Sequence, residues 1–189
     1  MPTGELDSLK GQFLMAMPGM VDPNFTQTVT CMCEHNQGGA MGLIINRRHP
    51  TLTAREIFDE LKIPCTDAAD SIPVFLGGPV HVDELFILHG PPFGWDACLN
   101  ITPGLALSNT PDIVEAIAGG SGPQAHLICL GCAGWGPGQL EHEIKQNAWL
   151  TTPVFEANVF DVPIERRWRE AMRKMGIDPA LLSGAAGHA

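Results

Sequence analysis

Two cysteines separated by two residues, Cys129 and Cys132, are the first feature of this sequence that could do chemistry. A CxxC pair is redox-active when its first thiol lies at a helix N-terminus, which lowers the thiol pKa. Here Cys129 lies in the apolar run LICL, which predicts a buried strand, and the next helix start is Pro137. If the strand continues through Cys132, the odd spacing directs the two side chains to opposite faces. The sequence therefore favours buried thiols over a redox pair.

A zinc site is the second chemistry that the cysteines suggest. Cys31 and Cys33 share one face of a predicted strand and could meet Cys129 across a sheet. Two such pairs of thiolates would satisfy a four-coordinate site. The Cys-x-Cys spacing is not that of a zinc knuckle, however, and we predict neither a metal site nor a cofactor.

Two glycine-rich segments, GGAMG at 38–42 and GWGPG at 134–138, raise the question of phosphate binding. Neither has the Lys-Ser/Thr of a P-loop, and neither has the GxGxxG pattern between a strand and a helix. The second segment opens a predicted helix whose N-terminus could hold an anion. Glu141 and Glu143 already supply negative charge there, so a tight strand-to-helix turn is the favoured interpretation.

Five side chains are candidate general acids or bases, namely His35, His89, Glu141, His142 and Glu143. Gln139 and Glu143 are four residues apart, so they share one face of the predicted helix. That face borders an apolar stripe and is either a solvated surface or the lining of a cleft. The sequence has no Ser-His-Asp order, HExxH motif or nucleophile elbow, and we assign no catalytic residue.

Short strands and helices must position these residues. Apolar runs predict strands at 13–17, 25–34, 43–45, 72–76, 85–89, 98–101, 105–107 and 127–130. Two hairpins are expected, one with its loop at 36–39 and one formed by 72–76 and 85–89. Helix starts are expected at Thr53 with its capping-box partner Glu56, at Thr110, at Pro137 and at Asp161. Because hairpins dominate the first half, the sequence predicts an α+β fold with a mixed or antiparallel sheet.

Composition limits the classes of partner. The chain has 189 residues and a formal net charge of −10, which disfavours direct binding to nucleic acid or to an anionic membrane. The N-terminal segment lacks the basic and apolar regions of a signal peptide, so we expect a cytoplasmic protein with reduced thiols. We expect residues 1–10 to be mobile and residues 11–189 to form one domain.

Several motifs, in order along the chain, resemble the AlgH/YqgE family of bacterial proteins. They are FLMAMPGMVDPNF (13–25), CEHNQGGAMGLIINR (33–47), LGGPV (76–80), ILHG (87–90) and LGCAGWGPGQLEHEIKQNAWL (130–150). The resemblance implies a single compact α+β domain with a curved, barrel-like sheet flanked by helices. It implies no established enzyme activity, cofactor or substrate. Cys132 stands where the family usually has Tyr, which makes the CxxC peculiar to this chain.

Some members of that family carry a transcriptional-regulator label of genetic origin. This sequence is acidic and has no helix-turn-helix signature, so a regulatory role would act through a protein or a small ligand and not by direct DNA reading. We predict a non-catalytic binding or regulatory protein with an unknown protein or small-molecule partner. The predicted binding residues, drawn from the matched motifs, are Asn46, Gly77, Gly78, His89, Trp135, Gln139 and Glu143. The alternatives are a hydrolase-like enzyme with His89 or Glu143 as general base, and a thiol switch or metal site.

Overall fold

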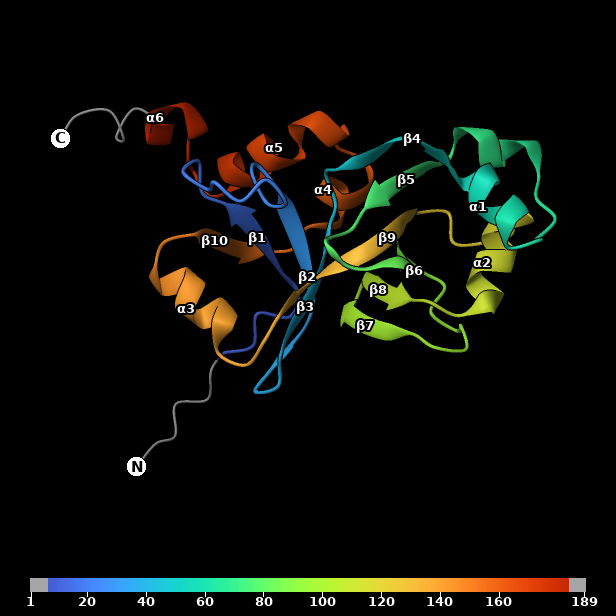
Figure 1. Cartoon of the computed structure of the whole chain (residues 1–189), viewed down its shortest axis with the longest axis horizontal. Helices are drawn as coiled ribbons and strands as arrows, with labels where there is room; N and C mark the ends of the chain where they lie inside the picture. The colour runs from blue at the N-terminus through green and yellow to red at the C-terminus, as the bar shows by residue number, and fades with distance from the viewer. Residues whose placement is uncertain (1–6, 184–189) are drawn as a thin grey trace.

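Strand β9 (His126–Trp135) lies at the centre of the fold, where it pairs with three other strands (Figure 1). The computed structural model describes residues 7–183, so the expected mobility of residues 1–10 concerns mostly residues outside this range. The other strands are β1 (Gln12–Ala16), β2 (Val29–Asn36), β3 (Gly39–Ile44), β4 (Arg48–Thr53), β5 (Pro73–Leu76), β6 (Val80–His89), β7 (Leu99–Thr102), β8 (Leu105–Ser108) and β10 (Trp149–Pro153). The helices are α1 (Ala54–Glu60), η1 (Asp67–Ser71), α2 (Pro111–Ala118), α3 (Gln139–Lys145), α4 (Glu156–Phe160), η2 (Ile164–Arg166), α5 (Arg167–Lys174) and α6 (Pro179–Ser183).

The ten strands form one mixed sheet, which confirms the α+β prediction. The main strand order is β10-β1-β2-β3-β9-β6-β8-β7, and β4 joins through β5. All pairs are antiparallel except β5 with β9. Within residues 7–183 no ladder joins β10 to β7, so the sheet remains open and does not close into a barrel.

The predicted hairpin between 72–76 and 85–89 was wrong, because β9 lies between those two strands. Val74 of β5 pairs with Ile128 in parallel, and Ile87 of β6 pairs with the same residue in antiparallel orientation. Val74, Ile87 and Ile128 are all buried, so the later strand contributes apolar contacts to both neighbours. The spacing of two strands in sequence does not reveal such an insertion.

The first hairpin is confirmed, with β2 and β3 joined at Asn36 and Gly39. The strand predicted to begin at Phe25 begins instead at Val29. The preceding segment turns because Asp22 Oδ1 accepts a hydrogen bond from the Asn24 amide at 2.9 Å. Phe25 therefore lies in a turn that precedes β2 and is not part of the sheet.

Three apolar clusters surround the sheet. The first packs α4 and α5 against the sheet and contains Phe13, Phe75 and the buried cysteines. The second packs α1 and α2 against β5, β6 and β9, and the third packs α3 against β1, β2 and β10. As a result α1 and α2 lie side by side at one end of the molecule, and α3 lies at the other (Figure 1).

The helix boundaries follow local signals at several points. The capping box at Thr53 is confirmed, with the Thr53 amide donating to Glu56 Oε2 at 2.8 Å. The helix expected from Asp161 begins instead as the short turn η2 and continues as α5, which ends before Gly176 at a φ of 74°. No helix within residues 7–183 has the length and apolar character needed to cross a membrane.

Candidate functional site

Three of the predicted binding residues, Trp135, Gln139 and Glu143, meet at one place. Trp135 Nε1 donates to Glu143 Oε2 at 3.0 Å, and Gln139 Nε2 donates to Glu143 Oε1 at 3.0 Å. Trp149 Nε1, which was not predicted, donates to the same Oε2 at 2.8 Å. We call these four residues the tryptophan–glutamate cluster. Its members come from the end of β9, from α3 and from the start of β10.

Asn46 does not belong to this cluster but holds the neighbouring turn, whose Phe25 ring contacts both tryptophans. Asn46 Oδ1 accepts from the Val29 amide at 2.9 Å, and Nδ2 donates to the Gln27 carbonyl at 2.8 Å. The Phe25 ring lies 5.4 Å from Trp149 and 5.9 Å from Trp135, centroid to centroid. Both polar atoms of Asn46 are therefore occupied in positioning a turn.

The tryptophan–glutamate cluster fastens α3 to the sheet. Trp135 and Trp149 are buried, and the Glu143 carboxylate accepts three hydrogen bonds from side chains. A general base needs a lone pair directed at its substrate. This arrangement gives no support to Glu143 as a base and fits a structural role.

His89 lies apart from the cluster. It pairs with His126 at one end of β9, whereas Trp135 is the last residue at the other end. Nine steps of about 3.3 Å separate the two ends by roughly 30 Å. The predicted single site that includes both His89 and Glu143 is therefore not formed.

The His89 ring is also closed to a substrate. It has no solvent exposure; Nδ1 donates to the Gly90 carbonyl at 2.7 Å and Nε2 accepts from the Ser108 hydroxyl at 2.9 Å. Burial lowers the pKa of His89, since the charged imidazolium loses its hydration. This geometry does not support His89 as a general base.

Gly77 and Gly78 are positioned by backbone packing. A Cβ at Gly77 would lie 2.3 Å from the Gly131 carbonyl oxygen, and a Cβ at Gly78 would lie 2.1 Å from the Cys132 carbonyl carbon. Gly78 also has a φ of 155°. Both glycines are required because the chain crosses β9 in direct contact with its backbone.

Cys129 and Cys132 lie on the same side of β9, which corrects the prediction that they point to opposite faces. Gly131, at a φ of 71°, interrupts the strand alternation between them. Both thiols join Cys31 and Cys33 in the first apolar cluster. Burial raises the pKa of the Cys129 and Cys132 thiols, which opposes thiolate formation. Within residues 7–183 no group of three or more His, Cys, Asp or Glu side chains is placed to hold a metal ion.

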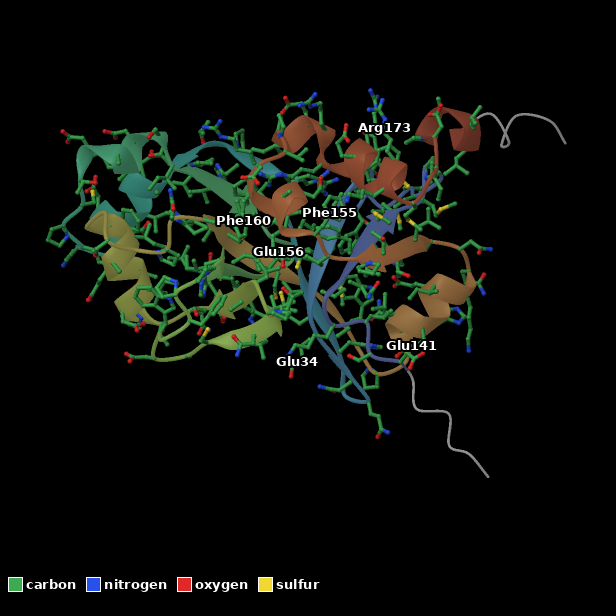
Figure 2. All side chains as sticks on the ribbon, turned by 180° about the vertical axis from the view of Figure 1, so that it is seen from behind. Glu34, Glu141, Phe155, Glu156, Phe160 and Arg173 are labelled. Atoms are coloured by element: carbon green, nitrogen blue, oxygen red, sulfur yellow. The ribbon has the colours of Figure 1, made fainter. Side chains whose placement is uncertain are left out.

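His35 and Glu141 form a pair that the sequence did not predict as a pair. The Leu9 amide donates to His35 Nδ1 at 2.9 Å, so Nε2 carries the proton and contacts Glu141 Oε1 at 2.8 Å. The backbone amide of Glu141 and the His35 contact lower the pKa of the carboxyl. Figure 2 places Glu141 on α3, at the end of the molecule opposite α1 and α2. Both ring nitrogens of His35 are engaged, and the pair connects the N-terminal segment to α3.

An open groove lies at the opposite end of the molecule, between α1, α2 and β6. Its volume is about 790 Å³, within the range of binding sites in proteins. The apolar lining includes Ile57, Leu61, Ile63, Val82, Leu85 and Val114. Leu61 is 51% exposed and Val82 is 56% exposed, so these large apolar side chains face solvent. We call this site the α1–α2 groove.

Acidic side chains form the rim of the α1–α2 groove. The lining includes Glu60, Asp83, Glu84 and Glu115, all of them exposed, and no Lys, Arg or His. Glu60 is on α1, Glu115 is on α2, and the other two are on β6. The groove therefore combines an apolar floor with negative charge on each wall.

A bulge in β6 builds one wall of the groove. Val80 pairs with Cys132 and Leu85 pairs with Leu130, so five residue steps of β6 are set against two of β9. His81 takes a φ of 50° at the start of the bulge. Gly131 lies opposite, where a Cβ would come within 2.5 Å of the Gly78 carbonyl oxygen. The Gly-Gly-Pro-Val motif thus shapes the bulge that projects Val82 and Asp83 outwards.

A family model described as AlgH-like (DUF179) matches residues 13–180. The chain belongs to the AlgH-like family. A UPF0301 protein of Desulforapulum autotrophicum is 56% identical over 169 residues, which cover 89% of each chain. A UPF0301 protein of Thioalkalivibrio sulfidiphilus is 48% identical over 179 residues, covering 94% of this chain and 95% of that protein.

Two solved structures share the fold. The solution structure of the AlgH protein from Pseudomonas aeruginosa matches with a TM-score of 0.81 at 44% identity, covering 100% of both chains. The crystal structure of a Corynebacterium diphtheriae protein matches with a TM-score of 0.72 at 23% identity, covering 92% of this chain and 90% of that one. The resemblance seen in the motifs is confirmed, and the names of these relatives state no activity.

The residues of the α1–α2 groove in this AlgH-like chain were not predicted from the sequence. One signal was available, since apolar Val80 and Val82 alternate with polar His81 and Asp83 directly after the Gly-Gly-Pro turn. Such an alternation predicts a strand with one buried face. The exposure of Val82 follows from the bulge, which the alternation does not encode.

Proposed function

We propose that this AlgH-like protein is a non-catalytic binding protein and that the α1–α2 groove is its binding surface. The observation that carries the proposal is the exposure of Leu61, directly after α1, and Val82, on β6, in the lining of one groove. Large apolar side chains gathered at a concave surface are typical of interaction sites. Burying such side chains on binding removes apolar area from water, which favours association.

The groove is supported by rigid elements, which limits the entropy lost on binding. Ile57 and Val114, on its α1 and α2 walls, belong to the second apolar cluster and are nearly fully buried. Leu61 lies directly after α1, and its amide donates to the Ile57 carbonyl at 2.9 Å. The buried part of the groove lining is thus continuous with the core, whereas Leu61 at its edge is exposed.

A designed helical peptide tests the proposal. Its one face carries leucines and its other face carries glutamines, so it offers apolar contact without charge. Fluorescence anisotropy of the labelled peptide measures binding to the full chain and to two variants. Val82→Asp places a charge on the groove wall, and Val21→Asp is the matched control at a site that is 92% exposed and outside the groove lining.

We expect the wild-type chain and Val21→Asp to bind this peptide equally, and Val82→Asp to bind at least about tenfold more weakly. Introducing an unpaired charge into an apolar contact costs more than the 1.4 kcal/mol that corresponds to a factor of ten. Equal binding by both variants would place the contact elsewhere. No binding to any of the three chains would contradict the proposed function.

A further inference from the structure

We infer that the α1–α2 groove receives the apolar face of a basic amphipathic helix belonging to a protein partner. This inference rests on the proposed function and specifies the chemistry of the partner. It is carried by two independent properties of one surface. The lining is largely apolar, with Leu61 and Val82 exposed on its walls, and the rim holds Glu60, Asp83, Glu84 and Glu115.

The rim charges remain available for a partner. Within residues 7–183, His81 is the only ion-pair partner of these four carboxylates, and it contacts Glu84 at 3.2 Å across an exposed surface. Nearby Arg55 does not neutralise the rim, because it is held by Asp70 and Asp67 on η1. Lysines or arginines that flank an apolar helical face would meet carboxylates on every wall.

The chemistry of the groove lining favours a helix over a small ligand. A small-molecule site uses a few inward-directed polar groups to orient its ligand. The buried side-chain atoms without a hydrogen-bond partner in the described residues are Thr30 Oγ1 and Asn158 Oδ1, and neither residue lines the groove. An apolar floor with a charged rim is the anatomy of a protein interface.

Charge also argues against other macromolecules. The chain carries a formal net charge of −10, so a second copy would bring further negative charge towards the same acidic rim. Nucleic acids and anionic membranes are repelled for the same reason. A basic segment is attracted at long range and then held by apolar contact.

Three peptides test the inference on the full chain. They share one leucine face, and their polar faces carry Lys, Gln or Glu. Each exposed ion pair contributes little, but four together correspond to about a tenfold gain in affinity. We expect the Lys peptide to bind about tenfold more tightly than the Gln peptide, and the Glu peptide to bind more weakly than both. The advantage of the Lys peptide should shrink as salt rises from about 0.05 M to about 0.5 M.

A matched pair of double variants locates the charge effect. Glu60→Gln with Glu115→Gln removes two rim charges, and Glu34→Gln with Glu165→Gln removes two exposed charges outside the groove. We expect the rim variant to bind the Lys peptide about threefold more weakly and the Gln peptide unchanged, and the control variant to match the wild type. Equal weakening in both variants would mean a non-specific effect of net charge and would overturn the inference.

The remaining outcomes separate the inference from the proposed function. If the Lys and Gln peptides bind wild type equally, the basic partner is excluded while the groove remains a binding site. If no peptide binds, the proposed function falls as well. Full displacement of the Lys peptide by spermidine, but not by sodium chloride of equal ionic strength, would indicate a small cation instead. A dimer in sedimentation that Val82→Asp dissociates would indicate a second copy.

Discussion

The indole rings of Trp135 and Trp149 lie edge to face, with centroids 6.0 Å apart and an interplanar angle of 80°. Both indole N–H groups donate to the same oxygen of Glu143. The two tryptophans come from β9 and β10, which are not neighbours in the sheet, and Glu143 comes from the helix between them. One carboxylate thus joins three elements at the end of the molecule opposite the α1–α2 groove.

Removing this carboxylate should destabilise the fold without affecting the groove. Glu143→Ala leaves two buried indole donors without an acceptor, so we expect the free energy of unfolding to fall by about 2–4 kcal/mol. Glu143→Gln keeps one acceptor and should cost about half as much. Urea unfolding measures both changes, and Gln146→Ala, at an exposed position after α3, is the control. A loss in Glu143→Ala no larger than in the control would contradict the structural role.

Gly131 should tolerate a side chain much less well than Gly138, although both have a left-handed φ, of 71° and 73°. A Cβ at Gly131 would lie 2.5 Å from the Gly78 carbonyl oxygen, whereas nothing lies within 4 Å of one at Gly138. Gly138→Ala should therefore cost about 1–2 kcal/mol from backbone strain alone. Gly131→Ala should cost about 1–3 kcal/mol more from overpacking. Equal losses in chemical unfolding would show that the bulge is not as tightly packed as described.

The cross-strand pair of His89 and His126 should make the protein less stable in mild acid. Burial lowers the pKa of both imidazoles in the folded chain. The two neutral imidazoles make their full contribution to the free energy of unfolding when the pH is above the unfolded-state pKa of about 6.5. As the pH drops below that value the contribution decreases, because the unfolded chain gains protons that the folded chain does not. We expect the free energy of unfolding to decrease between about pH 7 and pH 5.5, and the double variant His89→Gln with His126→Gln to show a smaller slope. His142→Gln, at an exposed residue, is the control, and an unchanged slope in the double variant would contradict this assignment.

The six cysteines should divide into two classes of reactivity. Cys65 and Cys98 are partly exposed, whereas Cys31, Cys33, Cys129 and Cys132 are buried. A thiol reagent added to the native chain should therefore modify two thiols quickly and the other four only after denaturation, since burial also raises the pKa of Cys129 and Cys132. Rapid native modification of Cys132 would revive the thiol-switch hypothesis.

Local signals in the sequence predicted much of the fold. The capping box at Thr53, the turn at Asn36 and the apolar run of β1 depend on neighbouring residues, and each formed where expected. The position of β9 between β5 and β6 depends on pairing between distant strands, which short-range patterns do not encode. The same holds for the same-side placement of Cys129 and Cys132, which one glycine decides.

The candidate site was predictable only in part, for a similar reason. Helical spacing correctly placed Gln139 and Glu143 on one face, where their side chains are in contact. Helical spacing could not show that the indole N–H groups of Trp135 and Trp149 would donate to the Glu143 carboxylate. The sequence does not distinguish Leu61 and Val82 from core residues: Leu61 continues the apolar stripe of Ile57 and Phe58, and only the structure shows that both side chains are exposed.

Hydrogen–deuterium exchange of the full chain, with and without the Lys-face peptide, shows where the peptide binds. We expect slower exchange in the segments that line the α1–α2 groove, at 57–63, 82–85 and 111–115. We expect no change around the tryptophan–glutamate cluster at 135–149. Protection confined to 135–149, or no protection in the three groove segments at saturating peptide, would contradict the claim that this groove is the binding surface.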